Sequence, residues 1–340
     1  MTLQASERSV IDPGPRYRLS RGMLTVSAAV ILLFVASAVV APTSVDHSAF
    51  LGMLPFAAVL AIAAIGQTLV VQQGGIDLSV PGAVSLAVVV TTHQSAGDDG
   101  RLLGALALGL VVAIGFGVAN GLLIGWRRLN PIVATLGTNA LMYAVVLAIS
   151  GGSPRRTTQL LREAAGGVTF GVPNSVYIGV VVVAVAAMVM KTTVGGRRFE
   201  AVGANPAAAA ATGLPVMRYR AAAYIWAQIL YWLAGVLLAG IIAQPTAFQG
   251  DSYLLPSVAA VVLGGTSLLG GRGFLVPTAI AAVFLSQLEQ FVLALGVSFA
   301  IRTLVEAAAL TVGVALYTVD WAALRHRFAG AAGRRTATTA

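Results

Sequence analysis

The chain has 340 residues, of which 58% are hydrophobic and only 10% are charged, whereas about 25% of the residues in an ordinary soluble domain are charged. The formal net charge is +9, but the arginines gather at the ends of apolar segments, where they orient a membrane protein rather than bind nucleic acid. Cysteine is absent, which excludes disulfides and thiol chemistry. The composition therefore indicates a helical protein whose partner is the lipid bilayer.

Apolar runs of about 20 residues recur along the chain, and each is long enough to cross ~30 Å of hydrocarbon as a helix. We expect about ten spans, at 23–40, 51–71, 80–92, 102–126, 131–150, 172–190, 219–243, 254–269, 274–295 and 299–319. The run at 80–92 is short for a full crossing. The sequence thus predicts an all-α, polytopic membrane fold.

The basic residues predict the orientation of these spans, because Lys and Arg concentrate in cytoplasmic loops. Most of the 21 basic residues fall on the cytoplasmic side if the N-terminus is inside. The segment before the first span lacks a small-residue cleavage site, so we interpret it as a tail rather than a signal peptide. We predict cytoplasmic tails at 1–22 and 320–340 and one transmembrane domain at 23–319.

Two Gly-rich polar stretches interrupt the hydrophobic pattern, QQGGIDLS at 72–79 and GGTSLLGGRG at 264–273. Polar backbone at membrane depth is tolerated only where protein or a water-filled cavity covers it. Broken helices in both halves of a transporter indicate a central pathway. We therefore predict two broken helix junctions and a translocation path. Its predicted residues are Gln72, Asp77, Thr266, Ser267 and Glu289.

The two acidic residues of this set each have a second interpretation. An ionisable group at membrane depth suggests function because its burial is costly. Asp77 is either a contact in the path or the N-cap of the helix that Val80 and Pro81 begin. Glu289 either lines the path or bonds to a neighbouring helix. The sequence leaves both alternatives open.

The longest predicted cytoplasmic loop, at 191–219, contains a helix-prone stretch bracketed by arginines, RRFEAVGANPAAAAATGLPV. Gly and Asn permit a turn, Pro begins a helix, alanines extend it and a later Gly ends it. Such a stretch is typical of a contact with a soluble partner, and the alternative is an ordinary amphipathic surface loop. The expected contact residues are Arg197, Arg198, Glu200, Gly203, Asn205 and Gly213.

Motifs of enzymes and metal sites are missing from the sequence. No G-x-x-x-x-G-K-[ST] loop is present to hold the phosphates of ATP, and no H-E-x-x-H motif occurs. The three histidines, His47, His93 and His326, lie far apart in the sequence. We predict no catalytic residue, no metal and no cofactor in this chain.

The motifs together resemble those of a known family. They are GQTLVVQQGGIDLSV at 66–80, NGLLIGWRRLNPIVATLGT at 120–138, the loop at 196–216 and AAVVLGGTSLLGGRG at 259–273. In this order they resemble the permease subunit of ribose-type (carbohydrate uptake class 2) bacterial ABC importers, over about 50–317.

The resemblance implies a multi-pass protein of the bacterial inner membrane that imports a monosaccharide such as a pentose or hexose. It implies three protein partners: a cytoplasmic ATP-binding subunit, a second permease that is identical or paralogous, and an extracytoplasmic sugar-binding protein. The loop at 191–219 would then be the coupling helix that docks on the ATPase. The alternative function is a self-sufficient secondary carrier or facilitator for a small polar solute.

One departure and one charge pattern concern the outer side. Members of the family carry an acidic residue on each side of a leucine before the AAVV block, where this chain has Leu254 and Pro256. This difference weakens the transfer of substrate identity from the family.

Several arginines in predicted outer loops violate the orientation rule, and we expect them to meet acidic groups of the binding protein. The expected docking residues are Arg155, Arg156, Arg162 and Asp251.

Overall fold

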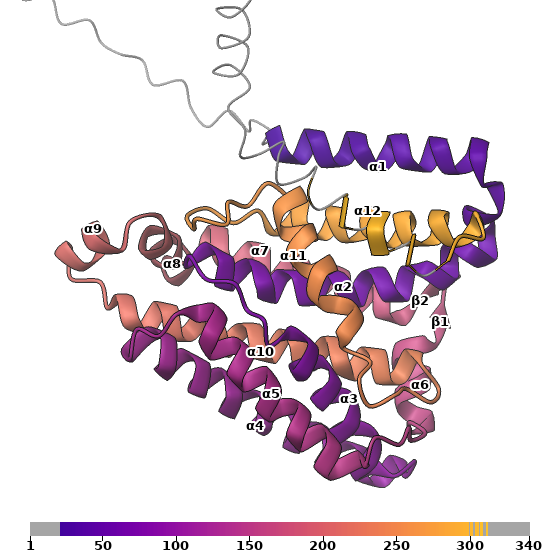
Figure 1. The fold of residues 1–340 in the computed structure, drawn as a ribbon, viewed down its shortest axis with the longest axis horizontal. Helices are drawn as coiled ribbons and strands as arrows, with labels where there is room; N and C mark the ends of the chain where they lie inside the picture. The colour runs from indigo at the N-terminus through magenta and orange to yellow at the C-terminus, as the bar shows by residue number, and fades with distance from the viewer. Residues whose placement is uncertain (1–20, 299, 302, 306, 309–310, 312–340) are drawn as a thin grey trace, which may run out of the picture.

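The computed structural model describes residues 21–298, 300–301, 303–305, 307–308 and 311. The predicted tails at 1–22 and 320–340 lie almost wholly outside the described residues, as does most of the predicted span at 299–319. The described chain is nearly all helical (Figure 1). Its long helices are α1 (Arg21–Val40), α2 (His47–Gln72), α4 (Asp99–Gly121), α5 (Pro131–Ser150), α7 (Asn174–Thr192), α10 (Val216–Ile241) and α12 (Leu275–Ala294).

Shorter elements connect or interrupt these helices. The short helices are α3 (Val80–Ser95), α6 (Gln159–Gly166), α8 (Val194–Ala204), α9 (Pro206–Ala211) and α11 (Leu254–Leu263). The remaining elements are the 3-10 turns η1 (Pro42–Ser44) and η3 (Asp251–Tyr253), the π-helical η2 (Leu122–Trp126), and the antiparallel pair β1 (Val168–Thr169) and β2 (Val172–Pro173).

Seven helices of the described chain are long and apolar enough to cross a membrane. The expected count of about ten includes a span at 299–319, most of which lies outside the described residues. The predicted run at 80–92, expected to be short for a crossing, is helix α3 of 16 residues. The predicted span at 254–269 is the short helix α11, of 10 residues. At 1.5 Å per residue these helices reach only about 24 Å and about 15 Å, less than the hydrocarbon thickness. The polytopic, all-helical fold class is confirmed.

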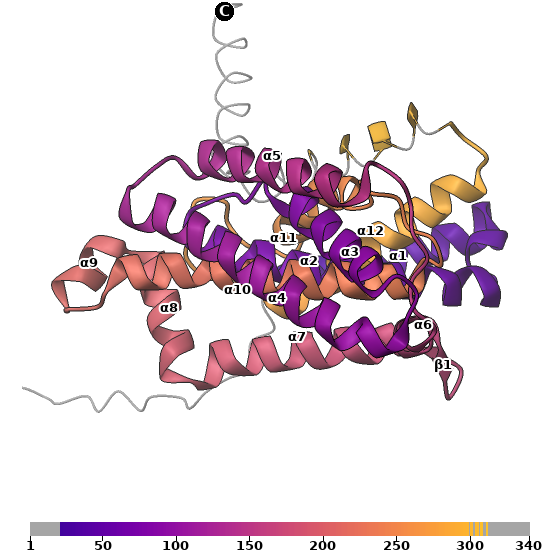
Figure 2. The same ribbon diagram turned by 90° about the horizontal axis from the view of Figure 1, so that it is seen from below.

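The centre of the protein is formed by α2 and α10. Helix α10 packs against α2, α3 and α4, and α2 packs also against α7, α11 and α12 (Figure 2). Within the most apolar stretch of each helix, 67% of the residues of α2 and 61% of those of α10 are buried. The corresponding fractions are 11% for α1 and 17% for α7. Helices that are apolar all round but exposed are suited to lipid, so α1 and α7 are peripheral.

Small residues allow the central helices to approach closely. A Cβ added at Gly117 of α4 would lie 2.7 Å from the Ile225 Cα of α10, and one at Gly235 of α10 would lie 2.6 Å from the Val84 carbonyl oxygen of α3. Backbones that touch in this way are typical of packed membrane helices. Helix α10 is therefore held against both α3 and α4.

The long helices run between two ends of the molecule. Helices α8 and α9 lie at one end, and α6 with the β1–β2 hairpin lies at the other (Figure 1). We call them the α8–α9 end and the α6 end. Helix α2 ends at the α8–α9 end, where Gln73 contacts Phe199 of α8.

Candidate translocation and coupling site

The first Gly-rich break returns the chain into the body of the protein. Helix α2 ends at Gln72, and Gly74 turns the chain with a φ of 77°, a conformation that favours glycine. Residues 73–79 form no helix or strand, and α3 then starts at the fully buried Val80. Helix α3 thus begins inside the molecule, as Figure 1 shows.

A buried polar network surrounds the start of α3. Asp77 is fully buried, and its Oδ1 accepts hydrogen bonds from the backbone N–H of Ser79 at 2.9 Å and from the Ser79 hydroxyl at 2.5 Å. The Ser79 Oγ accepts a bond of 2.8 Å from Gln228 of α10 and one of 3.4 Å from Asn120 of α4. Thr138 of α5 donates to the Asn120 Oδ1 at 2.9 Å. The Ser79 hydroxyl therefore links the break directly to α4 and α10, and Asn120 extends the network to α5.

This geometry bears on the two interpretations of Asp77. The N-cap of α3 is Ser79, and the Asp77 carboxylate bonds to that residue rather than to the first turn of the helix. The free N–H groups of this region are satisfied from α5 instead. Thr135 accepts from the Leu78 N–H at 2.9 Å, and Asn139 accepts from the Gly82 N–H at 2.8 Å. The N–H groups of Gly82 in the first turn of α3 and of Leu78 just before it thus have partners inside the protein.

The second break lies between α11 and α12. A Cβ at Gly264 would lie 2.7 Å from the Thr278 backbone nitrogen of α12, so the chain passes α12 in close contact. Thr266 is buried and its hydroxyl accepts from the Phe274 N–H at 3.1 Å, which closes the loop. Ser267 is exposed and accepts from the Leu269 N–H at 3.2 Å.

Both breaks meet α8 at one place. The Gly271 N–H donates to the Gln72 carbonyl at 3.0 Å, and the Gln73 side chain donates to the Phe199 carbonyl at 2.9 Å. A Cβ on Gly203 would overlap the Gln72 carbonyl oxygen. We call this meeting point the three-way junction; it comprises residues 72–74, 199–203 and 270–273.

One ion pair strengthens the junction at its surface. Arg272 Nε lies 3.1 Å from Glu200 Oε1, with 80% and 39% of the two side chains exposed. An exposed pair of this kind contributes only about 0–1 kcal/mol. The close backbone contact at Gly203, rather than this pair, therefore fixes the position of α8.

The Ala-rich stretch has the local structure that its sequence predicts. Asn205 caps α9 through a bond of 3.0 Å from the Ala208 N–H, Pro206 begins the helix, and Gly213 follows its end with a φ of 81°. Arg197 and Arg198 are exposed, and Arg197 donates to the Thr192 carbonyl at 3.1 Å. Helix α9 presents exposed alanines at 207–208 and 210–211.

The remaining predicted path residue, Glu289, lies elsewhere. It lines a cleft of about 340 Å³ near the α6 end, between the start of α2, the η3 turn and α12. Ser286, Gln290, Gln249 and Ser252 share this cleft. The structure thus places the predicted path residues in separate regions: Gln72 at the junction, Asp77 in the buried network, and Glu289 near the opposite end.

At the α6 end, the predicted docking residues are also divided. Arg155 and Arg156 follow α5, Arg162 lies on α6, and all three are exposed. No carboxylate of the described chain lies within ion-pair distance of them. Asp251 lies apart from them in η3, where it accepts a hydrogen bond from Tyr143 of α5.

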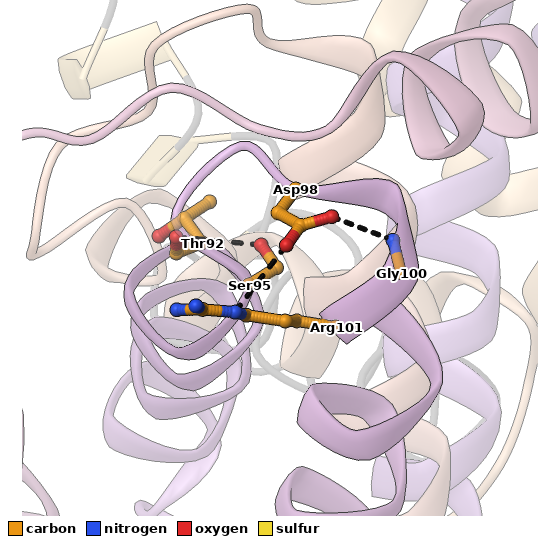
Figure 3. A network of polar contacts seen from close by, with 5 residues as sticks. All are labelled: Thr92, Ser95, Asp98, Gly100 and Arg101. Atoms are coloured by element: carbon orange, nitrogen blue, oxygen red, sulfur yellow. Dashed lines mark hydrogen bonds and ion pairs between the residues drawn. The ribbon is translucent and has the colours of Figure 1, made fainter.

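Arg101, another basic residue at this end, is paired within its own turn (Figure 3). Asp98 caps α4 by accepting from the Gly100 N–H at 2.8 Å, and its other oxygen lies 3.3 Å from Arg101 Nε. Ser95 closes the end of α3 by donating to the carbonyls of Thr91 and Thr92. This turn therefore satisfies its own charges.

Sequence reasoning did not select the other members of the buried network, in which Ser79 bonds to Asp77, Asn120 and Gln228 bond to Ser79, and Thr138 bonds to Asn120. A signal for two of them is present, because Asn120 and Gln228 are amides inside otherwise apolar spans. Polar residues at such positions usually bond across helices.

Comparisons with known proteins give a consistent result. The profile of the family described as "Branched-chain amino acid transport system / permease component" matches residues 49–319. A ribose import permease of Escherichia coli is 33% identical over 312 residues, which is 88% of this chain and 96% of the relative. A probable ABC transporter permease of Sinorhizobium fredii is 33% identical over 280 residues, 82% and 84% of the two chains. An autoinducer 2 import system permease of Photorhabdus temperata is 28% identical over 312 residues, 88% and 91% of the two. No solved structure matches.

The buried network gives a prediction about stability. Ser79→Ala removes the partner of Asp77 and of the Gln228 amide, and an unsatisfied buried group costs about 1–3 kcal/mol. We expect the thermal unfolding midpoint of the purified protein in detergent to fall by ~5 °C or more. The matched control is Ser267→Ala, whose hydroxyl is exposed. Equal midpoints for the two variants would show that the network does not stabilise the fold.

Proposed function

The chain belongs to this family of ABC transporter permease components, and we propose that the solute it carries is a monosaccharide such as a pentose or hexose. As a member it is a multi-pass protein of the bacterial inner membrane and the permease subunit of an ABC importer of the ribose or autoinducer 2 type. ATP hydrolysis belongs to another subunit. The single observation that supports a sugar is the match to ribose import permeases over most of both chains.

The test is uptake by proteoliposomes that contain the chain, its ATP-binding subunit and a sugar-loaded binding protein. We expect uptake of radiolabelled D-ribose that requires ATP and is stopped by vanadate, because the chain itself has no phosphate-binding loop. Uptake by the chain alone, driven by a proton or sodium gradient, would support a secondary carrier. ATP-driven uptake of autoinducer 2 in place of D-ribose would support the second substrate class, which the similarity to autoinducer 2 permeases favours.

The ATP-binding subunit is proposed to dock at the α8–α9 end, which then faces the cytoplasm. Two observations support this. The α9 alanines are exposed, and short side chains let a partner approach closely. Helix α8 is in contact with both Gly-rich breaks through Gly203, Phe199 and Glu200. A displacement of α8 by the partner would therefore act on both breaks at once.

The binding protein is proposed to dock at the opposite, α6 end. Arg155, Arg156 and Arg162 are exposed and have no carboxylate partner in the described part of the chain. An uncompensated positive patch attracts an acidic surface over a long range. A second permease, identical or paralogous, would complete the importer.

Coupling is tested at Gly203. In Gly203→Val the new side chain overlaps the Gln72 carbonyl, so α8 has to leave the junction. We expect normal membrane insertion, but uptake and stimulation of ATP hydrolysis reduced about tenfold or more, since overpacking costs about 1–3 kcal/mol. The matched control is Gly195→Val on the same helix, where the nearest neighbour, Thr193 Oγ1, is at an ordinary 3.7 Å. Wild-type stimulation by Gly203→Val would place the coupling contact elsewhere.

Docking is tested by replacing Arg155, Arg156 and Arg162 together with Gln. We expect the association rate of the binding protein to fall about tenfold at low salt and its salt dependence to flatten, because the long-range attraction is removed. Stopped-flow association with the detergent-solubilised importer measures both quantities. Arg101→Gln is the control, since Asp98 already neutralises that arginine. An unchanged salt slope in the triple variant would refute the docking role.

A further inference from the structure

The loop between α10 and α11 enters the protein rather than crossing its surface. The Gly250 N–H donates to the Ser85 hydroxyl of α3 at 3.0 Å, and a Cβ on Gly250 would overlap the Pro81 carbonyl oxygen. Ser85 lies ten residues before the end of α3 at Ser95, which corresponds to about 15 Å of helix. The loop therefore reaches well inside the level at which α3 ends.

At this depth the loop presents an acidic and an aromatic side chain. Asp251 is exposed and accepts a hydrogen bond from the Tyr143 hydroxyl of α5. The Phe248 ring is 39% exposed and packs edge-on against Tyr143, with centroids 5.4 Å apart and an interplanar angle of 73°. Tyr143 lies seven residues before the end of α5, about 10 Å along the helix. Contacts with α3 and α5 thus place Asp251, Phe248 and Tyr143 at a level well inside the ends of these two helices.

An exposed carboxylate at this depth cannot face lipid, because a charge in hydrocarbon is costly and is retained only towards a water-filled cavity or a partner. The side of the molecule that carries Asp251 therefore faces either the aqueous pathway or a partner protein. The three arginines proposed for docking lie apart from it, and no ion pair of the described residues involves Asp251. The position suits a solute more than a docked protein.

We propose that Asp251, Tyr143 and Phe248 form a contact site for the hydroxyl groups of the transported solute, on the extracytoplasmic half of the pathway. The inference rests on the proposed function, since it assumes a hydroxyl-rich solute. An ionised carboxylate offers only acceptors and receives bonds from neighbouring hydroxyl groups, while the Tyr143 hydroxyl both donates and accepts. The exposed ring of Phe248 covers the apolar C–H surface of such a solute.

The first experiment tests the placement and does not depend on the solute. The chain has no cysteine, so Asp251→Cys gives a single reporter. We expect a charged, hydrophilic methanethiosulfonate reagent to modify it rapidly in permeabilised cells, where the reagent reaches both sides. Val181→Cys on the peripheral α7 is the control, since Val181 is 59% exposed and is expected to face lipid. Equally slow modification of both cysteines would overturn the proposal.

The second experiment tests the chemistry in the complete importer. We expect Asp251→Asn to reduce the uptake of radiolabelled D-ribose about tenfold or more, as for the loss of a charged hydrogen bond. Stimulation of ATP hydrolysis by the loaded binding protein should stay within about twofold of wild type. Asp251→Glu, which keeps the carboxylate, should retain most of the uptake, and Tyr143→Phe should lose part of it. The control is Asp98→Asn, which replaces an exposed carboxylate in the turn before α4 and should leave uptake unchanged.

The outcomes separate the alternatives. Loss of uptake and of ATPase stimulation in parallel would make Asp251 a docking residue and overturn the solute site. Uptake by Asp251→Asn within about twofold of wild type would overturn it as well. Absence of D-ribose uptake by the wild-type importer would instead exclude ribose as its solute, and the cysteine labelling would then decide whether the side of the molecule that carries Asp251 borders the pathway.

Discussion

The fold depends on one constraint, which is that every polar backbone group at membrane depth needs a partner inside the protein. Helix α3 begins in the interior, so its first N–H groups have neither water nor a preceding turn to bond to. On α5, Asn139 accepts a bond from the Gly82 N–H in the first turn of α3, and Thr135, one turn away, accepts from the Leu78 N–H just before the helix. Ser79 joins the same region to α4 and α10. The broken helix is therefore possible only because three neighbouring helices carry the matching polar groups.

Local features of the fold could be predicted from the sequence, and long-range contacts could not. The turn at Asn205, the helix start at Pro206 and the end at Gly213 follow from propensities of adjacent residues, and the structure has them. Hydrophobicity alone does not distinguish a full span from a short buried helix, so the run at 254–269 predicts a span where the structure has the ten-residue α11. The meeting of Gln72, Gly203 and Gly271 joins segments far apart in the chain, and no local pattern encodes it.

Gly203 illustrates how the structure changes the meaning of a motif. The sequence suggests that this glycine allows a partner protein to approach. In the structure, its missing side chain leaves room for the carbonyl of Gln72 within the same chain. In the proposed docking of the ATP-binding subunit, the contact surface is the exposed alanine face of α9, while Gly203 holds α8 against the first break.

The contacts of the described chain connect the two ends of the molecule without a gap. Helix α8 contacts Gln72 and Gln73 at the first break, and the break leads directly into α3. Helix α3 is bonded to α5 through Asn139, and α5 carries Tyr143, which bonds to Asp251. Packed helices move as rigid bodies because their interiors are close-packed. In the proposed coupling, a displacement of α8 by the ATP-binding subunit reaches the side of the molecule that carries Asp251 through these contacts.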